Sequence, residues 1–189
     1  AREQIGDGCE LMLDCWMAFD VEYTVRLAER LRPYGLKWME ECLLSEDFDA
    51  NIALRQRLPW QGLATGEHWY THLPFQWACA HRVVDILQPD LTWVGGLSTC
   101  VKIAAAADAA GITVLPHGGG GTAFGQHFTM AMGCADLAEY FIGSPPGVPL
   151  EQLRGIPGVP IAKDGVVIPS NAPGFGMEIS EDWLTPFFG

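Results

Sequence analysis

The chain has 189 residues, of which 49% are hydrophobic and 18% are charged, a balance typical of a folded globular protein and not of a disordered segment. Its 23 acidic residues outnumber its 11 basic residues and give a formal net charge of −12, which argues against nucleic acid or an anionic membrane as a partner. No stretch of the sequence approaches the roughly 18 uninterrupted apolar residues of a membrane span.

Short apolar runs alternate with helical patterns over the first 143 residues. Strands are expected at 11–15, 36–40, 62–67, 83–90, 112–117 and 137–142. Helices are expected at about 20–33 with Asp20 as the N-cap, near 49–58, over 73–82, over 96–111 with Gly111 closing the helix, and near 123–132. This alternation indicates parallel strands joined by right-handed crossovers.

An ionisable residue lies at the downstream end of each expected strand, at intervals of 22 to 27 residues. An open doubly wound sheet uses only the strands at its switch point, whereas an α/β barrel gathers its site from the carboxyl ends of many strands. We therefore favour a parallel α/β barrel. The six residues are Asp14, Glu40, Glu67, Asp90, His117 and Glu139.

The barrel is expected to be partial, because six strand units in 189 residues fall short of the ~250 residues of an eight-unit barrel. We expect upstream sequence to supply the missing units. From residue 144 the pattern gives way to proline- and glycine-rich sequence with one strand-like run, VVIP at 166–169. We expect residues 1–143 to be the part of the barrel that carries the site, and 144–189 to be an irregular segment.

Three carboxylates, on Asp14, Glu40 and Glu67, end three successive strands. Adjacent strands lie about 4.8 Å apart, so these side chains can converge, and unpaired carboxylates at close range raise one another's pKa. A divalent cation relieves that repulsion, and ligation by oxygen alone favours Mg²⁺. The alternative is that each is a solvated loop acid.

His117, in the run VLPHGGGG, follows on the next strand but one after Glu67. Asp90 ends the strand between them and can accept a hydrogen bond from one ring nitrogen of His117, which would fix the tautomer and raise the basicity of the other nitrogen. We interpret His117 as a general base. The glycines after it indicate either close approach of the backbone to a ligand or a flexible loop. Trp16 shares a strand face with Asp14 and forms either a pocket wall or part of the barrel core.

The six cysteines are scattered without a C-x-x-C pair, and several lie in apolar runs. This pattern favours buried free thiols in a reducing compartment over disulfides. No secretory leader is visible from Ala1 onward, and we expect a cytoplasmic location.

The chain contains the runs LMLDCWMAFDVEYTVRLA, LKWMEECL, TGEH, QPD and PHG, and PGFGMEI near its end. These runs resemble the L-rhamnonate dehydratase family, in the mandelate racemase subgroup of the enolase superfamily, over about residues 9–145. The resemblance implies the modified TIM barrel of the enolase type, here in its C-terminal half. It also implies an upstream capping domain. The segment 144–189 would pack either on the barrel or on that capping domain.

The resemblance also implies roles for the residues. Asp14, Glu40 and Glu67 would hold Mg²⁺ against the substrate carboxylate, and His117, oriented by Asp90, would remove the proton alpha to it to form a metal-stabilised enediolate. Loss of the 3-hydroxyl as water would give a 2-keto-3-deoxy acid from L-rhamnonate or a close relative. Glu139 would hydrogen-bond the carboxylate or enediolate, and His68 would contact the substrate or act as an acid. A dimer or an octamer is implied.

Other functions stay open on the same residues. The run GGGGTAFGQHF after His117 and the proline-rich tail depart from the family pattern, so the substrate is less certain than the reaction class. L-lyxonate and L-mannonate are alternative substrates, and a racemase or epimerase is an alternative reaction that needs a second base from upstream sequence. The alternative outside the enzymes is a non-catalytic binding or structural protein that has kept the barrel fold.

Overall fold

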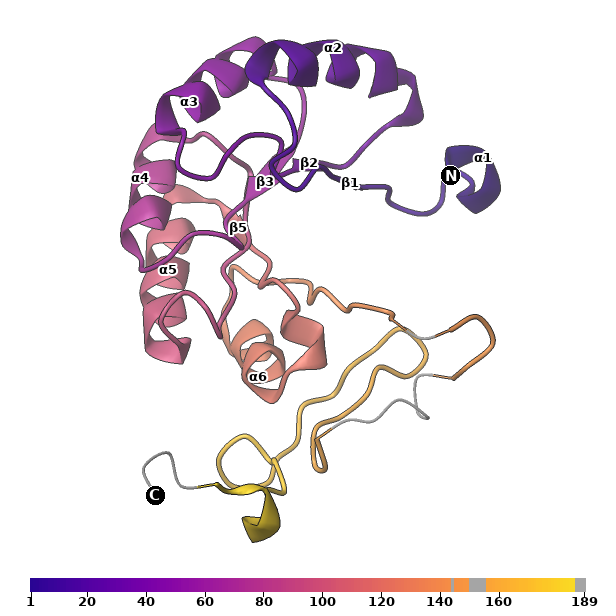
Figure 1. The fold of residues 1–189 in the computed structure, drawn as a ribbon, viewed down its shortest axis with the longest axis vertical. Coiled ribbons are helices and arrows are strands. Elements are labelled where there is room, and N and C mark those ends of the chain that lie inside the picture. Colours follow the sequence, from indigo (N-terminus) through magenta and orange to yellow (C-terminus); the bar gives the residue numbers. More distant parts are fainter. Residues whose placement is uncertain (144, 150–155, 186–189) are drawn as a thin grey trace.

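The computed structural model describes residues 1–143, 145–149 and 156–185 (Figure 1). Helices and short strands alternate from β1 to α6, as the sequence predicts. The strands are β1 Leu13–Asp14, β2 Met39–Glu40, β3 Leu63–Thr65, β4 Ile86–Leu87 and β5 Thr113–Val114. The helices are α1 Arg2–Ile5, α2 Val21–Leu31, α3 Phe48–Arg57, α4 Leu73–His81, α5 Leu97–Ala110 and α6 Ala123–Ala131, with 3-10 turns η1 Arg32–Tyr34, η2 Gly119–Gly121 and η4 Glu181–Trp183.

The five strands form one parallel sheet in the order β1-β2-β3-β4-β5. Each strand pairs with the next one along the chain, for example with Asp14 opposite Glu40. Helices α2 to α5 follow one another in an arc outside the strands (Figure 1). A doubly wound sheet reverses its strand order, whereas sequential order with helices on one side belongs to a barrel. The expected partial α/β barrel is confirmed.

The two faces of the sheet pack differently. Met39, Leu63 and Leu87 are buried in the main hydrophobic core, together with helix residues such as Leu54 and Ile103. On the other face, a small cluster of Trp38, Ala64 and Leu115, with Ile86 packed against it, fills the inside of the partial barrel. Alternation along each strand accounts for this division.

The helices begin where the sequence predicts. The Asp20 side chain accepts a hydrogen bond from the Tyr23 backbone N–H at the start of α2, and Gly111 closes α5 in the left-handed conformation. Asp47 and Thr122 cap α3 and α6 in the same way as Asp20 caps α2. The caps at Asp20, Asp47 and Thr122 end the loops that follow β1, β2 and His117, so local hydrogen bonds fix where each of these loops gives way to a helix.

The predicted sixth strand at 137–142 is wrong, because this segment joins no sheet in the described part of the chain. The Val114 backbone N–H donates a hydrogen bond to the Cys134 carbonyl, which brings the chain alongside β5. Further along, the Glu139 carbonyl accepts a hydrogen bond from the Gly120 N–H, which lies beyond the end of the sheet. Phe141 and Ile142 are 81% and 65% exposed, so the segment lacks the apolar cover that a strand of this sheet receives.

The segment after residue 143 is irregular where the structure describes it, as expected, and residues 144, 150–155 and 186–189 lie outside that description. The expected strand-like run near 166–169 contributes only an isolated bridge between Lys163 and Val166. The segment packs on α6, where the Gln126 side chain donates to the Pro160 carbonyl at 2.8 Å and Phe175 packs against Phe124.

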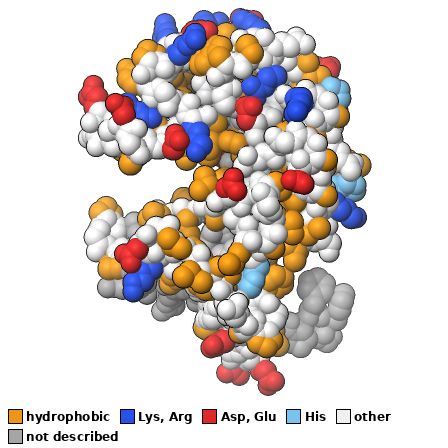
Figure 2. All heavy atoms as spheres, turned by 180° about the vertical axis from the view of Figure 1, so that it is seen from behind, with side chains coloured by type: hydrophobic (Ala, Val, Ile, Leu, Met, Phe, Trp, Pro, Cys, Tyr) orange, Lys and Arg blue, Asp and Glu red, His pale blue; other side chains and the backbone are white. Residues whose placement is uncertain are grey.

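The molecule is hollowed on one side, between the helical arc and the part formed by α6 and the C-terminal segment (Figure 2). A separate cavity of about 820 Å³ lies within the part formed by α6 and the C-terminal segment, between α6, residues 135–142 and residues 162–169. Exposed apolar side chains such as Met130 and Val166 line it. An incomplete barrel leaves apolar surface of this kind uncovered.

All six cysteines are free thiols, as predicted. Four are buried, Cys134 is half-buried and Cys9 is exposed. The sulfur atoms of Cys15 and Cys42, at the ends of β1 and β2, lie 3.7 Å apart. No described helix is both long enough and apolar enough to cross a membrane.

Candidate active site

The predicted metal ligands follow three neighbouring strands. Asp14 and Glu40 end β1 and β2 and stand opposite each other in the parallel register. Glu67 comes three residues after Ala64, the register partner of Glu40, so it reaches the site from beyond the end of β3. The sheet therefore brings all three carboxylates to its carboxyl edge.

Glu40 is buried inside the barrel, and its Oε2 accepts a hydrogen bond from Trp38 Nε1 at 3.0 Å. Burial raises the pKa of Glu40, and the charge of Asp14 raises it further. Hydrogen bonds from Gln88 and Trp38 lower this pKa but do not cancel the effect of burial. Asp14 is exposed, and its Oδ1 accepts a hydrogen bond from the Trp16 backbone N–H at 2.9 Å.

Glu67 lies between two histidines. Its Oε2 lies 3.3 Å from His117 Nε2, and its Oε1 lies 3.4 Å from His68 Nδ1. Burial raises the pKa of Glu67 to about 7, with the charges of Glu41 and Glu40 adding to the effect and the two histidines opposing it.

His117 and Asp90 pair as the sequence predicts, with Nδ1 of His117 2.9 Å from Oδ2 of Asp90. The other oxygen of Asp90 accepts hydrogen bonds from the Thr92 backbone, the Thr92 hydroxyl and the Trp93 backbone. Burial opposes charge on both partners, but hydrogen bonds from Thr92 and His117 hold the pKa of Asp90 below its ordinary value. Asp90 and Glu67 in turn raise the pKa of His117.

Glu139 reaches the same region although its segment is not a strand. Its Oε2 accepts a hydrogen bond from the Gly118 backbone N–H at 2.8 Å, directly after His117. The glycines that follow form the 3-10 turn η2 and pack closely, since a Cβ on Gly125 would meet the Gly119 carbonyl oxygen at 2.3 Å. A Cβ on Gly120 would likewise meet the Glu139 carbonyl oxygen at 2.8 Å, so close packing on backbone accounts for Gly120 and Gly125, whereas a Cβ on Gly118 or Gly121 would meet nothing within 4 Å.

His68 is flanked by two tryptophans, with ring centroids 5.9 Å from Trp16 and 5.6 Å from Trp93. Trp16 is 65% exposed, so the barrel-core alternative for this residue is wrong, and a role as a pocket wall stays a prediction. Trp93, which follows the QPD run by three residues, was not among the residues predicted from the sequence.

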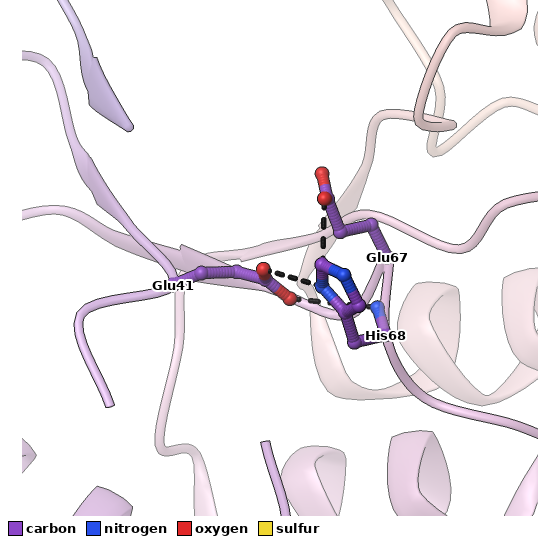
Figure 3. Close-up of side chains that lie close together, drawn as sticks. All are labelled: Glu41, Glu67 and His68. Carbon is purple, nitrogen blue, oxygen red and sulfur yellow. Dashed lines mark hydrogen bonds and ion pairs between the residues drawn. The ribbon is translucent and has the colours of Figure 1, made fainter. Parts of the chain in front are cut away.

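Glu41 is a second site residue that was not predicted from the sequence. Glu41 is buried, and its Oε2 lies 2.7 Å from His68 Nδ1 (Figure 3). The signal was the pair of adjacent glutamates that ends β2, of which only Glu40 was considered.

A divalent cation fits the donor chemistry of this edge. The predicted ligands offer only oxygen, and no lysine or arginine among the described residues forms an ion pair with Asp14, Glu40 or Glu67. The ligand atoms of Asp14, Glu40 and Glu67 do not all lie within 4.8 Å of one another. Among the described residues, the group whose ligand atoms do is Glu41, Glu67 and His68. The 2.7 Å contact from Glu41 to His68 is a hydrogen bond in that group, so we keep the three predicted carboxylates as the candidate ligands.

Backbone strain concentrates beside the site. Trp16 and Met17, after β1, and Glu41, after β2, have positive φ angles of 45°, 60° and 43°. Side chains other than glycine avoid this region unless neighbouring structure holds them there, and such residues gather at functional sites.

The comparisons with known proteins agree with this geometry. The family model "Enolase C-terminal domain-like" matches residues 1–183. L-rhamnonate dehydratase of Saccharopolyspora erythraea is 36% identical over 184 residues, which cover 96% of this chain and 47% of that protein. The crystal structure of L-rhamnonate dehydratase from Gibberella zeae matches with a TM-score of 0.85 at 32% identity, over 96% of this chain and 47% of that one. A structure of the Gibberella zeae enzyme complexed with Mg matches with a TM-score of 0.70 at 34% identity, over 74% and 34%.

The chain spans about half the length of these relatives, and the half that it matches is C-terminal. The family match covers every residue of the candidate site, from Asp14 to Glu139. The chain belongs to the enolase C-terminal domain-like family.

Proposed function

We propose that the protein to which this chain belongs is a Mg²⁺-dependent dehydratase of a sugar acid, L-rhamnonate or a close relative, and that residues 1–143 carry its active site. The observation that carries the proposal is the placement of His117. One ring nitrogen is held by Asp90 at 2.9 Å, and the other lies 3.3 Å from Glu67, on the edge where the carboxylates gather. An imidazole fixed in this way is suited to remove a proton from a substrate beside those carboxylates.

Asp14, Glu40 and Glu67 would hold the Mg²⁺, which supplies positive charge to the substrate carboxylate and to the charge that develops on it. The raised pKa values of Glu40 and Glu67 support this assignment, because they mark buried negative charge that a cation would stabilise. The Mg in the related Gibberella zeae structure supports the choice of metal.

The residues of this chain then account for each proton. Nε2 of His117 takes the proton from the carbon alpha to the carboxylate, and the electron pair moves into the carboxylate. The electron pair then returns to expel the 3-hydroxyl, which takes a proton from His117 or from His68 and departs as water, leaving a C2–C3 enol. The enol gives up its hydroxyl proton and gains a proton at C3 from solvent to become the 2-keto-3-deoxy acid. Glu139, whose Oε2 accepts a hydrogen bond from the Gly118 backbone N–H, would hydrogen-bond the substrate carboxylate or the enediolate, for which its carboxyl must carry a proton to donate.

We further propose that the described parts of 144–189 belong to a segment that packs on the barrel or on an upstream capping domain, and that the protein is a cytoplasmic homo-oligomer, a dimer or an octamer. The contacts of Gln126 and Phe124 with the segment support the first of these. The free cysteines support a reducing compartment.

A screen of the full-length protein against L-rhamnonate, L-lyxonate and L-mannonate, with and without Mg²⁺, tests the function. We expect a 2-keto product with at least one of these acids, and loss of the product with a chelator. Epimerised acid in place of the 2-keto product would mean a racemase or epimerase. If neither the 2-keto acid nor an epimerised acid forms, a binding protein is the better interpretation.

A further inference from the structure

Glu41 is buried at the carboxyl end of β2, and both of its carboxylate oxygens face one residue. Its side chain is only 1% exposed. Oε2 lies 2.7 Å from Nδ1 of His68, and Oε1 accepts a hydrogen bond from the His68 backbone N–H at 3.4 Å (Figure 3). Because one carboxylate holds both the ring and the backbone of His68, the contact fixes the direction of the ring.

The backbone of Glu41 is itself held on both sides. Its N–H donates to the Ala64 carbonyl at 3.0 Å, and its carbonyl accepts from the Met17 N–H at 2.5 Å. These bonds keep Glu41 at a φ of 43°, a conformation that costs free energy for a residue with a side chain. A buried carboxyl on a strained backbone lowers stability, so its presence points to a role beyond packing.

The pairing leaves one ring nitrogen of His68 for a ligand. Nδ1 contacts Glu41 and Glu67, and Nε2 has no hydrogen-bond partner among the residues that the structure describes. The ring is 18% exposed and lies between Trp16 and Trp93, both of which are large exposed side chains. Nε2 is therefore the atom of His68 that a substrate can reach.

The arrangement repeats that of His117. In each pair a carboxylate binds Nδ1, and the two histidines contact opposite oxygens of Glu67. We infer that Glu41 is a positioning residue that holds His68 in one tautomer and one orientation, with Nε2 presented to a hydroxyl group of the sugar acid. The inference rests on the proposed function for the identity of the substrate, but the hydrogen bond that it assigns can be tested without turnover.

A double-mutant cycle on the full-length protein tests the link between the two residues. We expect Glu41→Leu to lower kcat by roughly 10- to 100-fold, as loss of the partner of an active-site histidine commonly does. In a His68→Asn background the same change should lower kcat by less than about twofold, since its effect passes through His68. Equal losses in both backgrounds would show a general structural role and overturn the inference.

Other substitutions at Glu41 separate its properties. Glu41→Gln keeps one oxygen that can accept from Nδ1–H but loses the acceptor for the His68 backbone N–H, so it should retain more activity than Glu41→Leu. If Glu41→Leu does not fold, Glu41→Asp replaces it in the cycle, because its shorter side chain keeps the charge but not the reach. Glu46→Leu, at an exposed glutamate in the same connection, is the matched control and should leave kcat unchanged.

Crystal structures of the full-length variants give a readout that does not depend on the reaction. The His68 ring should keep its position in Glu41→Gln and rotate away in Glu41→Leu, while Glu67 and His117 stay in place. An unmoved ring in Glu41→Leu would overturn the inference even if the wild-type protein is an active dehydratase. If instead no sugar acid is turned over but the ring responds as expected, the assignment of the substrate fails and the positioning role stands.

Discussion

Nε2 of His117 lies 3.3 Å from Oε2 of Glu67, so the expected general base and an expected metal ligand face each other directly. The two residues follow strands β3 and β5, with β4 between them. The side chain of Asp90, which follows β4, holds the other nitrogen of the same ring. Three successive units of the barrel thus meet at one candidate site.

Replacement of His117 by asparagine should abolish dehydration. Asparagine cannot take a proton at neutral pH, and loss of a general base typically costs 10²- to 10⁴-fold in rate. Formation of the 2-keto acid, measured on the full-length protein, checks this, with His81→Asn on α4 as the control that should stay active. Turnover unaffected by His117→Asn would remove the assignment of the base.

Asp90→Asn should be nearly as damaging, for a reason that its hydrogen bonds supply. Three donors from Thr92 and Trp93 converge on Oδ1 and require an oxygen there, so the amide nitrogen of asparagine would face Nδ1 of His117. The amide would donate to Nδ1 and leave the proton on Nε2, the atom that must act as the base.

We expect a fall in kcat of about 10² to 10⁴ for Asp90→Asn, with little change in melting temperature. Asp108→Asn, an exposed position on α5, is the matched control. A variant with wild-type kcat would mean that the tautomer of His117 is not set by Asp90.

Metal-free protein should lose stability as the pH rises from 4.5 to about 7, because burial raises the pKa of Glu67 from 4.5 in the unfolded chain to about 7 in the folded protein. A carboxyl whose pKa is raised by folding stabilises the folded state at pH values below its ordinary pKa, and that contribution is lost as the pH rises through the folded-state pKa. Glu67→Gln should remove this pH dependence, so the melting temperature of the variant should gain on that of wild type as the pH rises from 4.5 to about 7 and keep a constant lead above that.

Added Mg²⁺ should reverse the comparison, raising the melting temperature of the wild type but not of Glu67→Gln. Thermal denaturation with and without a chelator measures both effects. An equal rise in the two proteins would place the cation away from Glu67.

Gly125→Ala should disturb the loop that carries His117. The added Cβ would meet the Gly119 carbonyl oxygen at 2.3 Å and its Cα at 2.4 Å, both backbone atoms that cannot rotate away. We expect a stability loss of about 1–3 kcal/mol, as for other overpacked positions, together with a lower kcat. Gly121→Ala, where a Cβ meets nothing within 4 Å, should behave like wild type in chemical denaturation.

Much of the fold can be predicted from the sequence because the signals are local. The Asp20 cap, the Gly111 stop and the apolar runs that become β1 to β5 each depend on a few neighbouring residues. The predicted strand at 137–142 has the same apolar character, but whether it pairs depends on neighbours that sequence pattern alone does not supply.

The site was predictable only in part for the same reason. The spacing of polar residues identified His117 and Asp90, since both follow strands that are adjacent in the sheet. The role of Glu41 depends on a positive φ and on the approach of β2 to the residues after β3, which are set by packing between distant segments.

The division of the sheet into two faces has a consequence for how such an enzyme can change. Met39 and Leu63 pack against the outer helices, while the strand ends and the loops beyond them carry the residues of the candidate site. Variation in those loops can redirect which hydroxyl groups are read without loosening the scaffold that supports them. New substrates would then arise from exchanges at one rim of the barrel, and heat resistance from exchanges on its outside.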